Sequence, residues 1–265
     1  MKIRTLFLIL LMGLLHQHSK EQSIPFSFYQ IPNYAQSDAS FYTAVVNPAL
    51  LGVAGKISAS LYSEMPYGLV DIRRTAGSAC FPFSSGVFGA HLLYEGNATF
   101  SETAFLLQYA RKLGEQKSFA GVSFGVTQKR DAGYTTLLQY LAAFGLQLPL
   151  SEKIKYGVVM QLRQMQESEE YQVFAMDYQL GIGYRFTPQF SGTVQLNKDA
   201  KREPFFYVKA GYQMHKRVLI NLVCSTSTEE LWAQSVFSLK NMELGISVGF
   251  HQMLGLTPGS LIMTK

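Results

Sequence analysis

The chain has little charge and, beyond residue 20, no long apolar run. Asp, Glu, Lys and Arg make up 15% of the 265 residues, whereas ordinary soluble domains carry about 25%. A membrane-spanning helix needs about 20 consecutive apolar residues, and no segment after residue 20 approaches that length. The low charge argues against an ordinary soluble domain, and the missing apolar runs argue against helical spans.

Residues of catalytic and metal-binding type are also scarce. No G-x-S-x-G sequence, phosphate loop or dinucleotide fingerprint occurs, and no His or Cys pair has the spacing of a zinc site. The cysteines, Cys80 and Cys224, could form a disulfide in an oxidising compartment, but they lie far apart in strand-like segments and we expect two free thiols. We therefore expect no enzymatic activity, no catalytic residue, no cofactor and no metal.

The formal net charge of +5 does not indicate a nucleic-acid partner. The Lys and Arg residues are scattered along the chain, and none of them forms a dense basic run. Charged strand ends and a charged barrel lumen account for them better.

Apolar residues alternate with small or polar residues in at least nine stretches. Between Ala120 and Thr127, for example, Val122 and Phe124 share one face while Gly121 and Ser123 share the other. A period of two predicts a strand with one apolar face, and each stretch is about long enough to cross a membrane as a tilted strand. This pattern predicts an all-β transmembrane β-barrel, and a soluble β-sandwich is the alternative.

Turn signals divide residues 54–265 into segments that we expect to form an antiparallel barrel. The predicted strands are 54–64, 68–81, 84–95, 98–112, 117–130, 133–149, 153–166, 170–186, 189–198, 204–214, 217–226, 230–240, 242–252 and 256–264. These are fourteen strands, with twelve as the alternative because the last segment is the least regular. Short turns alternate with longer connections, as in outer-membrane barrels, and this places both barrel ends on the periplasmic side.

The N-terminal region differs from the rest of the chain. Lys2 and Arg4 precede an apolar stretch that ends near Leu15 and is followed by polar residues, which resembles a secretory signal peptide over residues 1–20. Residues 21–53 contain three prolines and several aromatic residues without long alternation. We expect this segment to pack inside the barrel as a plug, or to lie against its periplasmic rim.

The alternation assigns the apolar face of each strand to lipid and the other face to the lumen. Outward candidates include Phe88, Phe124, Tyr140, Phe174 and Phe250. The inward candidates are charged residues of both signs and histidines. They are Lys56, Arg73, His91, Lys155, Arg163, Asp177, Arg185, Lys209, Glu243 and His251. We expect these residues to cross-link the lumen.

A motif stands directly before the first predicted strand. It is NPALLG, in which Asn47 and Pro48 make a rigid entry to the barrel, Ala49 follows, and Gly52 lets the chain bend. Preceded by SDASFY and echoed by VGFHQMLGLTP near the C-terminus, it resembles the N-terminal region of the PorP/SprF family of type IX secretion-associated outer-membrane proteins. It also resembles the NPA element of PorV, PorQ and FadL-type transporters, many of which form fourteen-stranded barrels.

The resemblance implies a non-enzymatic protein of the outer membrane of a Gram-negative bacterium. Its expected role is an accessory or anchoring component of a type IX-like secretion system, with the lipid bilayer and other secretion proteins as partners. The alternative is an outer-membrane transporter or channel for hydrophobic or small solutes, as in FadL-type proteins.

Overall fold

The computed structural model describes Tyr34 and residues 41–264, apart from 115–116, 132–136, 167–171, 201–202 and 227–229. The expected signal peptide at residues 1–20 therefore lies outside the described residues, as does most of residues 21–40. Within the described part, no helix is long and apolar enough to cross a membrane.

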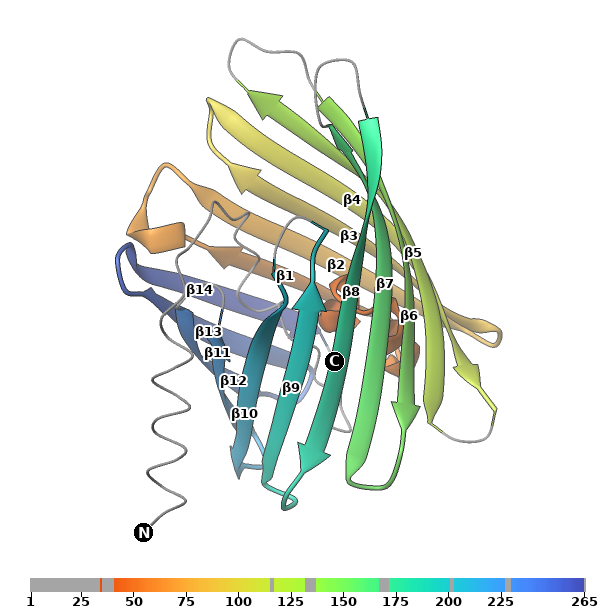
Figure 1. The fold of residues 1–265 in the computed structure, drawn as a ribbon. Coiled ribbons are helices and arrows are strands. Elements are labelled where there is room, and N and C mark those ends of the chain that lie inside the picture. The colour runs from red at the N-terminus through yellow and green to blue at the C-terminus, as the bar shows by residue number, and fades with distance from the viewer. Residues whose placement is uncertain are drawn as a thin grey trace.

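Fourteen antiparallel strands close into one barrel (Figure 1). They are β1 (Ser58–Glu64), β2 (Arg73–Phe83), β3 (Gly86–Gly96), β4 (Phe100–Leu113), β5 (Ser118–Asp131), β6 (Leu137–Pro149), β7 (Ile154–Gln166), β8 (Gln172–Arg185), β9 (Phe190–Lys198), β10 (Phe205–His215), β11 (Val218–Ser225), β12 (Glu230–Ser238), β13 (Met242–His251) and β14 (Gly255–Thr264). The predicted fold class is confirmed, and each strand overlaps one of the predicted segments.

The outward face is apolar over the whole barrel. Phe124 on β5 is 64% exposed and Phe174 on β8 is 69% exposed, although a water-soluble protein would bury such side chains. On the same β5 strand the neighbouring Ser123 is buried. This polarity, apolar outside and polar inside, is that of a barrel in lipid, so the β-sandwich alternative is wrong.

The last strand closes the barrel. Residues Ser60 to Glu64 of β1 pair with residues Gly259 to Met263 of β14, and β14 also pairs along its whole length with β13. The twelve-strand alternative is therefore wrong. The backbone hydrogen bonds of both end strands are satisfied in the ring, as a span without exposed edges requires.

The two ends of the barrel differ in their connections. One end, called here the short-turn end, carries tight turns such as residues 84–85 and 216–217, whereas the other, the long-loop end, carries connections such as residues 65–72 and 199–204. The 3-10 turn η3 (Pro66–Gly68) lies in the first of these loops. Outer-membrane barrels have their short turns in the periplasm, which places the starting end of β1 and the final end of β14 there.

Strand length also divides the barrel. Strands β4 to β8 have 13 or 14 residues, whereas β9 to β14 have 8 to 11. The longer strands stand higher at the long-loop end in Figure 1. At the boundary, β8 pairs with β9 only from Tyr178 to Arg185, so β8 continues from Gln172 to Asp177 past the last residue of β9. This boundary is called the β8–β9 step.

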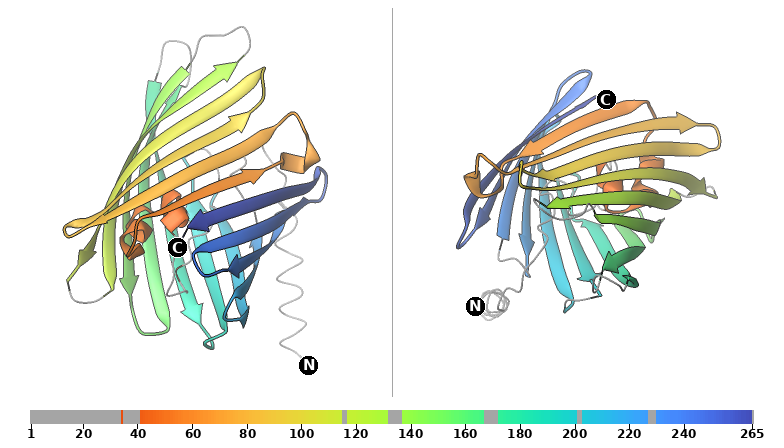
Figure 2. Two further views of the ribbon diagram at one scale, coloured as in Figure 1. Left: turned by 180° about the vertical axis from the view of Figure 1, so that it is seen from behind. Right: turned by 90° about the horizontal axis from the view of Figure 1, so that it is seen from above.

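Two short 3-10 helices precede β1 and lie inside the ring of strands (Figure 2). They are η1 (Phe41–Val45) and η2 (Pro48–Val53), and η2 contacts β3, β4, β5 and β6. Leu51 of η2 is buried in one core cluster with Leu106 of β4. Residues 41–53 and Tyr34 are called the internal segment below.

Both cysteines are free thiols, as expected. Cys80 is buried on β2 and Cys224 is half-buried on β11.

Candidate functional site in the barrel lumen

Asn47 organises the internal segment. Its side-chain oxygen accepts a hydrogen bond from the Ala49 amide at 3.0 Å, which caps η2 while Pro48 begins it. Its side-chain nitrogen donates to the Tyr34 hydroxyl at 3.1 Å and to the Leu146 carbonyl of β6 at 3.3 Å. The motif therefore joins the helical turn to the barrel wall.

The wall beneath this segment is lined with inward-facing glycines. A Cβ atom at Gly145 would overlap the Asn47 side chain, and one at Gly121 would overlap the backbone of Pro48. A Cβ at either Gly157 or Gly181 would overlap the Tyr34 ring. Only glycine permits so close an approach. The four glycines lie on β5 to β8 and form a track that receives the internal segment.

Polar side chains fix the segment further along the wall. The Gln108 amide of β4 donates to the Ala44 carbonyl of η1 at 2.8 Å. Gln108 is itself held by His91 of β3, whose Nε2 lies 2.8 Å from its side-chain oxygen, while His91 Nδ1 lies 2.7 Å from the Ser78 hydroxyl. Burial also raises the pKa of the Tyr34 phenol, so its hydroxyl stays protonated. The inner faces of β3 to β8 are called the packed wall.

A buried ion cluster lies beside the closing seam. Arg74 of β2 pairs with Glu64 of β1 at 3.0 Å and with Glu95 of β3 at 2.9 Å, and the Tyr62 hydroxyl donates to Glu64. The prediction of Arg73 as a lumen residue is wrong by one position, because Arg73 is exposed and Arg74 is buried. Because two arginines stand side by side at the start of β2, the sequence does not show which of them faces the lumen.

A second ion cluster lies at the β8–β9 step. Arg163 of β7 pairs with Asp177 of β8 at 3.1 Å and with Asp199, just after β9, at 3.6 Å. Asp177 also accepts a hydrogen bond from the Ala200 amide at 3.1 Å. These contacts hold the end of β9 to the longer strands, although the backbone pairing has already ended.

The other predicted lumen residues lie at several depths. Lys155 and Arg185 are half-buried on the inward-facing sides of β7 and β8, and Lys209 is buried on β10. Glu243 of β13 accepts a hydrogen bond from Ser238. His251 ends β13, where its ring accepts hydrogen bonds from the Met253 and Leu254 amides.

Two predicted positions differ from their expected roles. Lys56 is exposed and precedes β1, so it does not belong to a strand of the barrel wall, and its place in the lumen stays a prediction. Gly52 does not provide a bend into a strand but lies against the Phe119 ring of β5. Sequence reasoning missed Tyr34, Glu64 and Arg74, whose partners are fixed by strand register and by the position of the internal segment.

The inner faces of β9 to β12 carry mainly amides, small polar groups and aromatic rings. Gln195 of β9 donates to Asn197 at 2.7 Å and to Gln179 of β8 at 3.4 Å. Tyr207 of β10 and Trp232 of β12 are buried in a second apolar cluster with Val223 of β11. These inner faces are called the amide wall.

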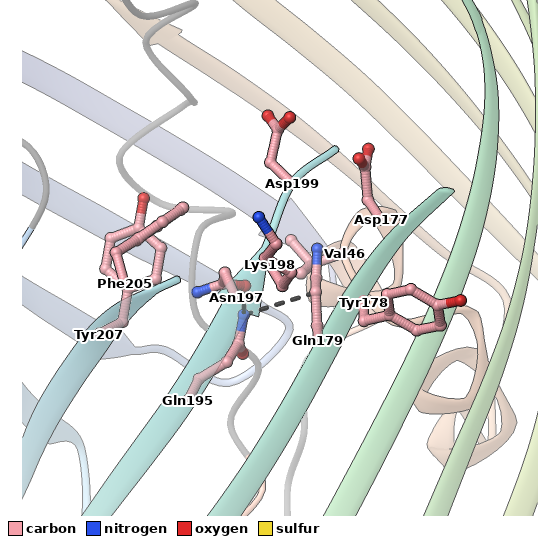
Figure 3. Close-up of a pocket in the computed structure, with 10 residues that line it drawn as sticks. All are labelled: Val46, Asp177, Tyr178, Gln179, Gln195, Asn197, Lys198, Asp199, Phe205 and Tyr207. Carbon is pink, nitrogen blue, oxygen red and sulfur yellow. Dashed lines mark hydrogen bonds between the residues drawn. The ribbon is translucent and has the colours of Figure 1, made fainter. Parts of the chain in front are cut away.

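A cavity of about 170 Å³ lies between the amide wall and the internal segment (Figure 3). Its lining combines the amides of Gln179, Gln195 and Asn197 with the rings of Phe205 and Tyr207, and Val46 of the internal segment lies on its other side. Tyr178 and Lys198, which are exposed on the barrel surface, line it as well. The cavity therefore meets residues of both faces of the wall, at the step where β8 loses its partner.

The described part of the lumen contains no group of three or more His, Cys, Asp or Glu side chains that could hold a metal ion. The arrangement can bind, position or pass a solute.

Comparison with known proteins supports the fold. No protein-family model and no curated protein matches the chain. The toluene transporter TbuX of Ralstonia pickettii superposes with a TM-score of 0.60 at 10% identity, over 86% of this chain and 93% of that chain. The toluene transporter TodX of Pseudomonas putida gives 0.60 at 8% identity, over 85% and 92%. The monoaromatic hydrocarbon channel CymD gives 0.58 at 10% identity, over 91% and 97%.

The closed barrel, its apolar outer face and these similarities define the class of the protein. It is a membrane-embedded β-barrel of the outer membrane of a Gram-negative bacterium. The comparisons give no support to the PorP/SprF resemblance or to secretion-system partners, which stay predictions from the NPALLG motif.

Proposed function

We propose that the protein is an outer-membrane channel for small solutes that combine an apolar ring with a hydrogen-bonding group. The observation that carries this proposal is the cavity at the β8–β9 step, which meets residues of both the inner and the outer face of the wall. The proposal follows the alternative expectation, a transporter or channel, and departs from the secretion role.

The size and lining of the cavity support this solute class. A cavity of about 150 Å³ is large enough to hold benzene, and this one measures about 170 Å³. Phe205 and Tyr207 offer ring surfaces, while Gln179, Gln195 and Asn197 offer donors and acceptors. Ligand sites commonly combine a mostly apolar lining with a few polar groups that orient the ligand.

The structural neighbours also support a channel for aromatic solutes. Two of them are described as toluene transporters and one as a monoaromatic hydrocarbon channel. At identities of 8 to 10% the likeness establishes the fold alone, so the solute class rests on the cavity.

Uptake into vesicles tests the proposal. Labelled benzyl alcohol would be supplied to vesicles whose outer leaflet is lipopolysaccharide, which slows unassisted passage of apolar solutes. We expect the protein to raise the initial rate several-fold over protein-free vesicles. Asn197→Phe, which fills the cavity, should remove most of that increase, whereas Asn241→Phe in an exposed turn should leave it unchanged.

Two results would count against the channel. The first is an uptake rate equal to that of protein-free vesicles. The second is an Asn197→Phe variant that transports as fast as the unmodified protein while showing the same strand content by circular dichroism.

A further inference from the structure

The amide wall contains a buried lysine, Lys209, that has no counter-ion among the described residues. Lys209 lies at the middle of β10, and its exposed fraction is 8%. Its neighbours Phe206, Val208 and Tyr212 point to lipid and are more than 40% exposed, so the alternation turns Lys209 into the lumen. Among the described residues, no side chain makes a hydrogen bond or ion pair with its ammonium group.

The surroundings of Lys209 are neutral. It pairs across the sheet with Thr193 of β9 and Val223 of β11, and strands β9, β10 and β11 contain no Asp or Glu. Of the lumen carboxylates already described, Glu64, Glu95, Asp177 and Asp199 have arginine partners, and Glu243 of β13 accepts a hydrogen bond from Ser238. An ionised group held away from water is unfavourable unless it is paired, so Lys209 lacks the partner that its burial requires.

Hydrogen-bonding groups nearby also lack partners. The buried side-chain oxygens of Gln195 and Asn221 and the buried amide nitrogen of Asn197 have no hydrogen bond in the structure. They lie on the strands on either side of Lys209. Buried polar atoms are normally satisfied, and one bound polar solute could satisfy several of them together with the ammonium group.

Aromatic surface lies next to the cation. Tyr207 precedes Lys209 by two residues on the same face of β10 and also lines the cavity at the β8–β9 step. Val223, the cross-strand partner of Lys209, pairs in turn with Trp232 of β12. A ligand with a negative group on Lys209 would thus have Tyr207, Val223 and Trp232 within reach of its apolar part.

We infer that the lumen holds a binding site for a small aromatic carboxylate, with the carboxylate on Lys209 and the ring against Tyr207, Val223 and Trp232. This deepens the proposed channel function, because it names the solute class, but the binding site itself does not depend on transport. The ligand differs in charge from toluene, which two structural neighbours are named for.

The chain provides its own reporter for this site. Trp232 is the one tryptophan of the sequence, and it is buried in the amide wall. Its fluorescence in detergent micelles would be followed during titration with sodium benzoate and, separately, with benzamide, which has the same shape and no charge. We expect saturable quenching by benzoate and at least tenfold weaker binding of benzamide.

Variants separate the charge from the fold. Lys209→Met keeps the length of the side chain and removes the charge, so we expect benzoate to bind at least tenfold more weakly. Lys209→Arg should bind within about threefold of the unmodified protein, because the charge is retained. Lys129→Met is the matched control, since Lys129 pairs with Glu102 on another wall, and it should bind benzoate normally. Lys209→Arg keeps the test decisive if Lys209→Met does not fold.

Several outcomes would overturn the inference. They are benzoate binding unchanged in Lys209→Met, benzamide binding as tightly as benzoate, and no benzoate response in either fluorescence or calorimetry. Competition by sulfate at the same affinity as benzoate would also overturn it, because the site would then bind any anion. Benzoate binding by a protein that fails the vesicle uptake test would refute the proposed channel and leave this site standing.

Discussion

The packed wall and the amide wall enclose the same lumen but line it with different kinds of residue. The packed wall has glycines where other residues would carry side chains. Tyr34 and Asn47 of the same chain fill that space and form a hydrogen bond with each other. The amide wall keeps long polar side chains, and Gln195, Asn197 and Asn221 retain atoms without a partner. One wall is completed by the protein itself, whereas the other has the chemistry to accept a solute.

The largest expected effect comes from obstructing the glycine track. Gly157→Val places a branched side chain where the Tyr34 ring lies. We expect a loss of about 2–3 kcal/mol in the free energy of unfolding, the upper part of the range for overpacking. Urea unfolding in lipid vesicles, followed by Trp232 fluorescence, measures it.

Gly77→Val on β2 is the control for this variant. A Cβ there meets nothing within 4 Å, so its stability should change by less than about 0.5 kcal/mol. Equal losses in both variants would show that the glycine track does not hold the internal segment.

A smaller effect is expected from the motif residue itself. Asn47→Ala removes hydrogen bonds to Ala49, Tyr34 and the Leu146 carbonyl and leaves buried groups unsatisfied, which should cost about 1–3 kcal/mol. A double-mutant cycle with Tyr34→Phe, measured by the same unfolding assay, should give non-additive losses because the two side chains touch. Strict additivity would contradict that contact.

The smallest effect is expected at the rim of the packed wall. Lys129 and Glu102 form an ion pair at 3.1 Å, but their side chains are 37% and 34% exposed. Glu102→Gln should therefore change the free energy of unfolding by no more than about 0.5 kcal/mol. A loss as large as that of Asn47→Ala would mean that the packed wall depends on its rim as much as on its glycines.

The strands could be predicted from the sequence because the alternation of apolar and polar residues is visible within each strand by itself. Alternation along Ala120 to Thr127 is a local property, and it locates β5 without knowledge of any neighbour. The same alternation predicts that Lys209 faces the lumen, and the structure buries its side chain while Phe206 and Val208 beside it are exposed. The prediction of Arg73 failed because Arg74 stands next to it, and adjacent residues of one type leave the register undetermined.

The site depended on contacts that a single sequence does not contain. Gly145 and Gly157 could be recognised as inward-facing, but the rings and amides that occupy their space come from residues 34 and 47. The cavity lies at the step where β9 ends before β8 does, and its lining joins three strands, β8, β9 and β10, with the internal segment. Distances across a lumen are set by barrel closure, which no local pattern encodes.

The unequal strand lengths have a consequence for the surrounding lipid. A strand rises about 3.4 Å per residue and tilts by about 40°. The 8 residues of β11 therefore cover about 20 Å of bilayer depth, and the 14 residues of β5 about 35 Å. Lipid thins or the barrel tilts to match such a difference. The membrane should thus be thinnest beside the amide wall, so the protein shapes its bilayer unevenly around its own circumference.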